Sequence, residues 1–92
     1  MLVYKFNPEF VFEKDGSDTI VYNLENEVVY ILNESGAIAF DSLLTFDNLR
    51  QSEEFYFKTT KYPVNEQTRE DYKEFSEYLL SENIFIPEEV DI

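Results

Sequence analysis

The clearest pattern along the chain is a pair of short runs, residues 19–24 and 28–32, in which apolar positions alternate. Both runs are rich in β-branched and aromatic residues, and a period of two is typical of a β-strand. A polar turn, residues 24–27, separates them, and Asn26 can adopt the positive φ that a two-residue hairpin turn needs. The pattern therefore predicts an antiparallel hairpin.

A further strand and a helix flank this hairpin. Residues 10–13 are mostly apolar and stand shortly before an Asp-Gly turn signal, so they predict a first strand. After the hairpin, residues 37–44 carry a helical apolar stripe, and Asn33 or Ser35 can accept the unpaired N–H groups at its start. We therefore expect a three-stranded antiparallel sheet that leads directly into a helix.

The middle of the chain has a weaker pattern. A second helix is expected from about Asp47, with Leu49 on its apolar side. Residues 55–59 also alternate as a strand would, so both interpretations stay open for this segment. A proline at residue 63 then interrupts the pattern.

The strongest helical pattern lies toward the C-terminus. Tyr72, Phe75 and Leu79 recur at spacings of three and four, and Asn65 or Thr68 can cap the helix that they predict. Three strands followed by three helices form a winged-helix-like arrangement of the α+β class. The predicted organisation is one domain over residues 1–92, with a core of about 10–86, an extended arm over 1–9 and an acidic tail over 87–92.

The composition excludes several kinds of chemistry. The chain has no Cys and no His, which removes disulfides, the usual zinc sites and Cys nucleophiles. The adjacent pairs Glu53-Glu54 and Glu88-Glu89 are typical of solvated surface. We therefore expect no enzyme activity, no metal and no cofactor. No segment resembles a signal peptide or a membrane span, so a cytoplasmic protein is expected.

The net charge of −13, from 20 acidic and 7 basic residues, points to the kind of partner. Nucleic acids and anionic membranes should be repelled, because binding them needs clustered Lys and Arg. Basic or apolar partners are expected instead. A purely solubilising role for the excess acid fits the composition equally well.

One segment resembles a known family. Residues 21–37 run from an apolar strand through a polar turn and an aromatic strand to Leu32-Asn33-Glu34-Ser35-Gly36-Ala37, followed by Phe40 and Leu44. This is similar to the central motif of PqqD-like proteins, and the third helix with its Asn83-Ile84 end resembles that family's closing helix. The family often has Trp at the position of Phe40 and Gly at that of Asn83, and residues 50–61 match it poorly.

The resemblance implies a RiPP recognition element, a non-catalytic domain that captures the leader of a ribosomally synthesised precursor peptide. The leader would add as a strand beside residues 28–32, in a groove shared with the third helix, and be presented to a modifying enzyme. Open strand edges accept such additions through backbone hydrogen bonds. The candidate contacts by position are Val28, Val29, Tyr30, Ile31, Arg69, Tyr72, Lys73, Ser76 and Leu80.

Each candidate also has a structural interpretation. Val28 and Tyr30 could be core residues, and Arg69 and Lys73 could pair with glutamates of their own helix. Leu80 lies off the apolar stripe of that helix and could cover the C-terminal segment.

Two other function classes compete with leader binding. A winged-helix DNA regulator fits the fold class, although the third helix carries an excess of acid. An acidic mimic of nucleic acid, or an inhibitor of a basic partner protein, would explain the charge but not the motif. A homodimer is also open, because an edge strand can pair with its own copy.

Overall fold

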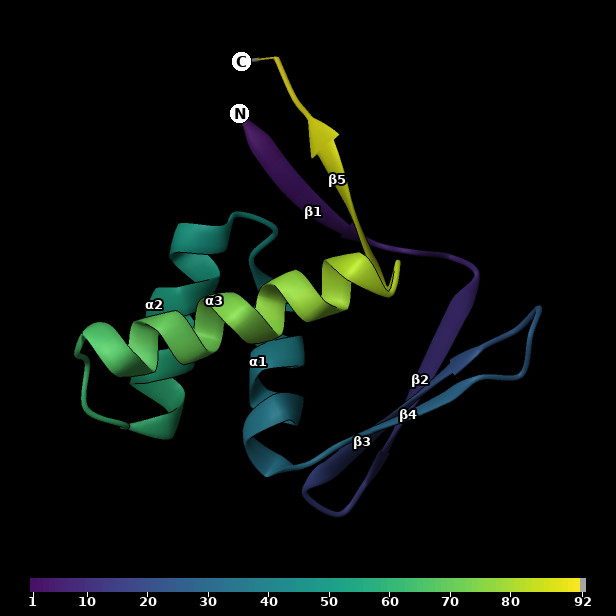
Figure 1. Cartoon of the computed structure of the whole chain (residues 1–92), viewed down its shortest axis with the longest axis horizontal. Helices are drawn as coiled ribbons and strands as arrows, with labels where there is room; N and C mark the ends of the chain where they lie inside the picture. Colours follow the sequence, from purple (N-terminus) through teal and green to yellow (C-terminus); the bar gives the residue numbers. More distant parts are fainter. Residues whose placement is uncertain (92) are drawn as a thin grey trace.

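The computed structural model describes residues 1–91 and arranges them as two antiparallel sheets and three helices (Figure 1). The elements in chain order are β1 (Leu2–Phe6), β2 (Phe10–Asp15), β3 (Asp18–Asn23), β4 (Val29–Leu32), α1 (Glu34–Thr45), α2 (Leu49–Thr60), α3 (Glu66–Ser81) and β5 (Phe85–Glu89). The predicted α+β, winged-helix-like class is confirmed, and a second sheet is added to it.

The predicted three-stranded sheet has the order β2-β3-β4, with antiparallel neighbours. The Asn23 N–H donates to the Val28 carbonyl at 2.9 Å, so residues 24–27 form the loop between β3 and β4. The positive φ of this loop, 61°, falls on Glu27 and not on Asn26, so the predicted two-residue turn is wrong. The side-chain oxygens of Asn23 and Asn26 accept backbone N–H groups and stabilise the longer loop.

One face of this sheet packs on the rest of the protein. On that face Thr19, Val21 and Leu32 are buried. On the opposite face Val29 and Ile31 are 50% and 70% exposed. All three helices lie on one side of the sheet in Figure 1. The alternation along the strands therefore separates a core face from a solvent face.

α1 begins at a predicted cap and buries the predicted stripe. The Asn33 side chain accepts the Gly36 N–H at 3.0 Å, which satisfies one of the unpaired donors at the helix start. Phe40 and Leu43 are buried, and Leu44 packs against the same cluster. The apolar stripe read from the sequence is thus the core-facing side of α1.

α2 resolves the ambiguity in the middle of the chain in favour of a helix. Asn48 caps it, and the alternative strand over residues 55–59 is wrong. Ser52 and Tyr56 lie one helical turn apart on α2, and both contact Tyr72 of α3. Ser52 accepts a hydrogen bond from the Tyr72 hydroxyl at 2.8 Å, and the Tyr56 ring lies 4.8 Å from the Tyr72 ring, measured between centroids. Packing against α3 therefore stabilises a segment whose local pattern is weak.

α3 is the longest helix, and both of its predicted caps take part. Asn65 and Thr68 form a capping box, in which each side chain accepts the backbone N–H of the other residue. Tyr72 and Leu79 are buried, and Phe75 packs at the border of the core.

The two ends of the chain form a second sheet that was not predicted. β1 and β5 pair antiparallel, with Phe6 opposite Phe85 and Leu2 opposite Glu89. Residues expected to form an arm therefore contribute to the core, where Val3 is 3% exposed. The expected acidic tail begins inside β5. Figure 1 shows this ribbon projecting beyond the helices.

The core is centred on Phe40 of α1, which is fully buried. The rings of Phe6, Phe12 and Phe85 meet it edge-on at centroid distances of 5.7, 5.1 and 5.5 Å. Edge-to-face contacts of this kind add to the stabilisation from buried area. Both sheets are thereby attached to α1. In the described part of the chain, no helix has the length and apolarity needed to cross a bilayer.

Candidate functional site

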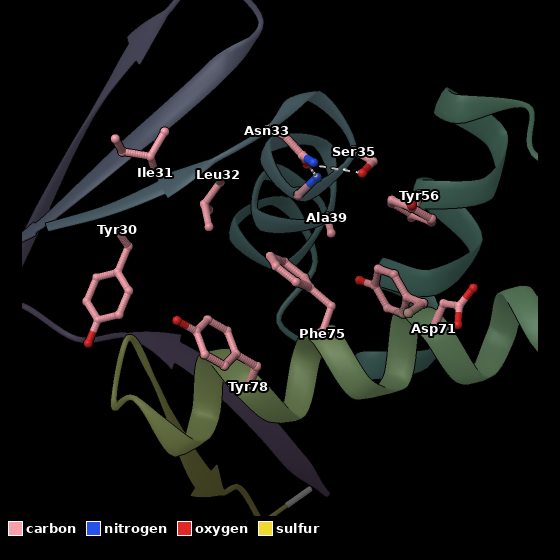
Figure 2. Close-up of a pocket in the computed structure, with 12 residues that line it drawn as sticks. Tyr30, Ile31, Leu32, Asn33, Ser35, Ala39, Tyr56, Asp71, Phe75 and Tyr78 are labelled. Atoms are coloured by element: carbon pink, nitrogen blue, oxygen red, sulfur yellow. Dashed lines mark hydrogen bonds between the residues drawn. The ribbon is translucent and has the colours of Figure 1, made fainter.

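A groove of about 490 Å³ lies between β4 and α3 (Figure 2). One wall is β4, with Tyr30 to Leu32, and the facing wall is α3, with Phe75 and Tyr78. The start of α1 forms the floor, and Tyr56 of α2 closes one end. Most of these side chains are aromatic or aliphatic, so the groove suits apolar groups.

The strand wall has an open backbone edge. β4 is last in the order β2-β3-β4, so one of its sides has no strand partner among residues 1–91. Bonded and non-bonded pairs alternate in an antiparallel ladder, and Asn23–Val28 is a bonded pair. It follows that Tyr30 bonds to β3, whereas the N–H and C=O groups of Val29 and Ile31 point to the open edge.

The α3 wall is an aromatic row connected to β4. Tyr78 lies edge-on to Tyr30 at 6.4 Å between ring centroids, and Phe75 is the same distance from Tyr78 along the helix. The Tyr30 hydroxyl donates to Glu82 at 3.1 Å. Burial and, to a smaller extent, this hydrogen bond raise the pKa of Tyr30, so its hydroxyl stays protonated further into the alkaline range.

The floor explains part of the Leu32-to-Ala37 motif. A Cβ on Gly36 would lie 3.3 Å from Asn33 Oδ1 and 3.4 Å from the Phe75 ring. The contact with Asn33 Oδ1 is tighter than ordinary van der Waals distances, and that with the Phe75 ring is at their lower limit, so the glycine leaves room for α3 beside the start of α1. Asn33 caps α1, and Gly36 allows Phe75 of α3 to lie close to the start of α1, which forms the floor of the groove.

The far end of the groove is polar. Asp71 lines it beside Tyr56, and the neighbouring charge of Asp71 adds to burial in raising the pKa of Tyr56. Tyr72 forms the base of this end, where its hydroxyl donates to Ser52 at 2.8 Å. Burial raises the pKa of Tyr72 to about 12, although the Ser52 hydrogen bond acts in the opposite direction.

The structure brings two of the four predicted strand residues, Tyr30 and Ile31, to the lining of this groove. Val29 does not line it, but its open backbone groups lie next to them on β4. Tyr30 also packs against the core cluster, so its two interpretations are compatible. Val28 is 41% exposed at the loop, which makes core packing wrong for this residue.

The structure does not bring the predicted helix residues to the groove, except Tyr72. Arg69 and Lys73 line a separate hollow of about 590 Å³ between α2 and α3. Arg69 lies 3.5 Å from Glu53 of α2, so the predicted pairing within α3 is wrong for Arg69. Ser76 and Leu80 line a small internal space on the same flank. Leu80 lies off the apolar stripe of α3 but packs against the core cluster that includes Phe85, which agrees with the alternative that it covers the C-terminal segment.

Sequence reasoning missed Tyr56, Asp71 and Tyr78 and assigned Phe75 only to the core. Asp71, Phe75, Tyr78 and Glu82 recur at spacings of four, three and four, which is a second stripe beside the buried one. That spacing was a usable signal. Nothing local shows which of the two flanks of a buried stripe faces a strand edge. Among residues 1–91, no three acidic side chains converge as a metal site would require.

No protein-family model matches the chain, and no curated protein gives a significant sequence match. Among solved structures, the chain is similar to TbiB1, which was solved in complex with the TbiA(beta) leader peptide. The two superpose with a TM-score of 0.76 over 95% of this chain and 99% of TbiB1, at 15% sequence identity. At that identity, the similarity shows a shared fold.

Proposed function

We propose that this protein is a non-catalytic peptide-binding protein. It captures the leader of a ribosomally synthesised precursor peptide as a strand on β4 and presents it to a modifying enzyme. The proposal is supported by the motif that resembles PqqD-like proteins and by the shared fold with a protein solved with a leader peptide.

The observation that carries the proposal is an open strand edge beside an aromatic groove. The free backbone groups of Val29 and Ile31 offer hydrogen bonds to an added strand. Side chains alternate along that strand, so every second one faces the groove between β4 and α3. Backbone bonds supply affinity with little sequence demand, and the groove supplies selectivity.

Strand addition with two or three filled pockets is compatible with an affinity on the order of 1 μM, about −8 kcal/mol. The test is a fluorescence-anisotropy titration with a labelled leader peptide from the precursor encoded beside this gene. Ile31→Pro removes an outward N–H that β3 does not use, so the sheet should tolerate it. We expect the variant to bind at least about tenfold more weakly, a loss of about 1.4 kcal/mol.

Ile31→Ala is the matched control, because it keeps the N–H and removes only the side chain. Ile31 lines the groove, but its side chain is 70% exposed and points away from α3 in Figure 2, so we expect the affinity to change by less than about twofold. Near-UV circular dichroism checks that both variants are folded. The absence of saturable binding by the natural protein, or equal binding by Ile31→Pro, would contradict strand addition. Presentation is tested by whether enzyme-catalysed modification of the precursor falls in parallel with affinity.

A further inference from the structure

An acidic side chain lines one end of the groove, and a second one, outside the lining, accepts a hydrogen bond from a lining residue at the other end. Asp71 lines the end beside Tyr56. At the other end, Glu82 holds the Tyr30 hydroxyl with one carboxylate oxygen, Oε1, and is only partly buried. A carboxylate has about four acceptor positions, so Glu82 can accept further hydrogen bonds from a ligand.

The basic residues of α3 lie on its other flank. Arg69 and Lys73 line the hollow between α2 and α3, and Arg69 pairs with Glu53 there. No Lys or Arg of residues 1–91 lines the groove. The local charge around a bound strand is therefore negative at each end, in the same sense as the net charge of −13.

The spacing of the two carboxylates corresponds to a short strand. Asp71 and Glu82 are about three turns apart on α3, or about 16 Å along the helix axis. An extended chain covers that distance in about five residues, at about 3.4 Å per residue. Tyr30 and Tyr78 lie opposite each other toward one end, and Phe75 lies further along the groove (Figure 2).

Resting on the proposed function, we infer that the groove selects a peptide segment in which Lys or Arg residues flank alternating apolar residues. Because side chains alternate along a strand, two residues that both face the groove are an even number of positions apart. The two basic residues are therefore four or six positions apart, so that one reaches Glu82 and the other Asp71. The apolar residues between them contact Tyr30, Phe75 and Tyr78. Charge-assisted hydrogen bonds at both ends determine the register of the peptide on β4.

The test is selection of a phage-displayed library of random short peptides on the immobilised protein. We expect Lys or Arg to be enriched at two positions four or six apart, with apolar residues at alternate positions between them. Glu82→Gln should lose the enrichment at one of these positions. Glu77→Gln is the matched control, since it removes an equal charge from α3 at an exposed residue that neither lines the groove nor bonds Tyr30.

A selected peptide is then resynthesised with Gln in place of the basic residue assigned to Glu82. We expect its affinity for the natural protein to fall about tenfold, and its affinity for Glu82→Gln to change by less than about twofold. Enriched peptides without a basic bias, or a bias that survives in Glu82→Gln, would overturn this inference and leave peptide binding intact. If no enriched peptide loses affinity for Ile31→Pro, the proposed strand addition fails instead.

Discussion

Gly36 shows how one residue controls the width of the groove. Its position in α1 needs no unusual backbone conformation, so conformational freedom does not explain the glycine. The reason is the close packing around it, since an added Cβ would lie 3.3 Å from Asn33 Oδ1 and 3.4 Å from the Phe75 ring. A methyl group there crowds the Asn33 cap and presses against the aromatic wall of the groove.

We predict that Gly36→Ala weakens peptide binding about three- to tenfold but changes the free energy of unfolding by less than about 1 kcal/mol. The gain in helix propensity, about 1 kcal/mol, offsets the cost of the tight contact. Titration with the leader peptide and urea denaturation measure the two effects. Gly16→Ala is the contrasting control, because its φ of +62° is strained for alanine and no atom lies within 4 Å of the new Cβ. It should lower stability by about 1 kcal/mol and leave affinity unchanged.

Among the elements, α3 carries two flanks with different environments. The Phe75 and Tyr78 flank faces β4 across the groove. The Arg69 and Lys73 flank faces α2 across the second hollow. Tyr72 lies between them and lines both spaces. A helix of this kind can bind a peptide on one side while its other side supports α2.

The two flanks can be compared with two alanine variants. We expect Tyr78→Ala to lower peptide affinity about tenfold, because it removes the ring that meets Tyr30. Lys73→Ala should change affinity by less than about twofold, since this side chain lies on the other flank. Both residues are exposed, so large effects on folding are not expected. A larger loss of affinity with Lys73→Ala than with Tyr78→Ala would contradict the assignment of peptide binding to the Phe75 and Tyr78 flank.

For the molecule as a whole, the buried contact between α2 and α3 couples stability to pH. The Tyr72 hydroxyl is buried against Ser52, and its pKa is about 12 instead of the ordinary 10.0. The folded state therefore holds this proton more tightly than the unfolded chain does. Its contribution to stability is fully present below pH 10 and is lost as pH rises toward 12.

We predict that the free energy of unfolding falls by on the order of 3 kcal/mol across that alkaline range because of Tyr72. Urea denaturation at a series of pH values measures the slope. Tyr72→Phe should lose about 1 kcal/mol at neutral pH and show a shallower alkaline decline. The Ser52 hydroxyl keeps its bond to the Leu49 carbonyl in that variant, so no buried donor is left unpaired. An unchanged alkaline slope in Tyr72→Phe would show that this buried hydroxyl does not control the effect.

Local sequence patterns were sufficient to predict the hairpin, the capped starts of α1 and α3, and the winged-helix-like class. Strand alternation, helix periodicity and Asx capping act within a few residues, so the sequence alone carries them. They were not sufficient for the β3–β4 loop, where Glu27 rather than Asn26 has the positive φ. They also left α2 ambiguous, because its contacts with Tyr72 come from another helix.

Tertiary structure alone decided the pairing of β1 with β5 and the composition of the groove. Pairing between the two ends of a chain leaves no periodic trace, since each end reads only as a short apolar run. The strand residues of the candidate site could be predicted from the motif. The motif indicates a hairpin, and the chain order places the second strand of that hairpin at the edge of the sheet. The helix residues could not, because the orientation of α3 depends on the packing of Tyr72 and Leu79 in the core. That packing turns Phe75 and Tyr78, and not Arg69 and Lys73, toward β4.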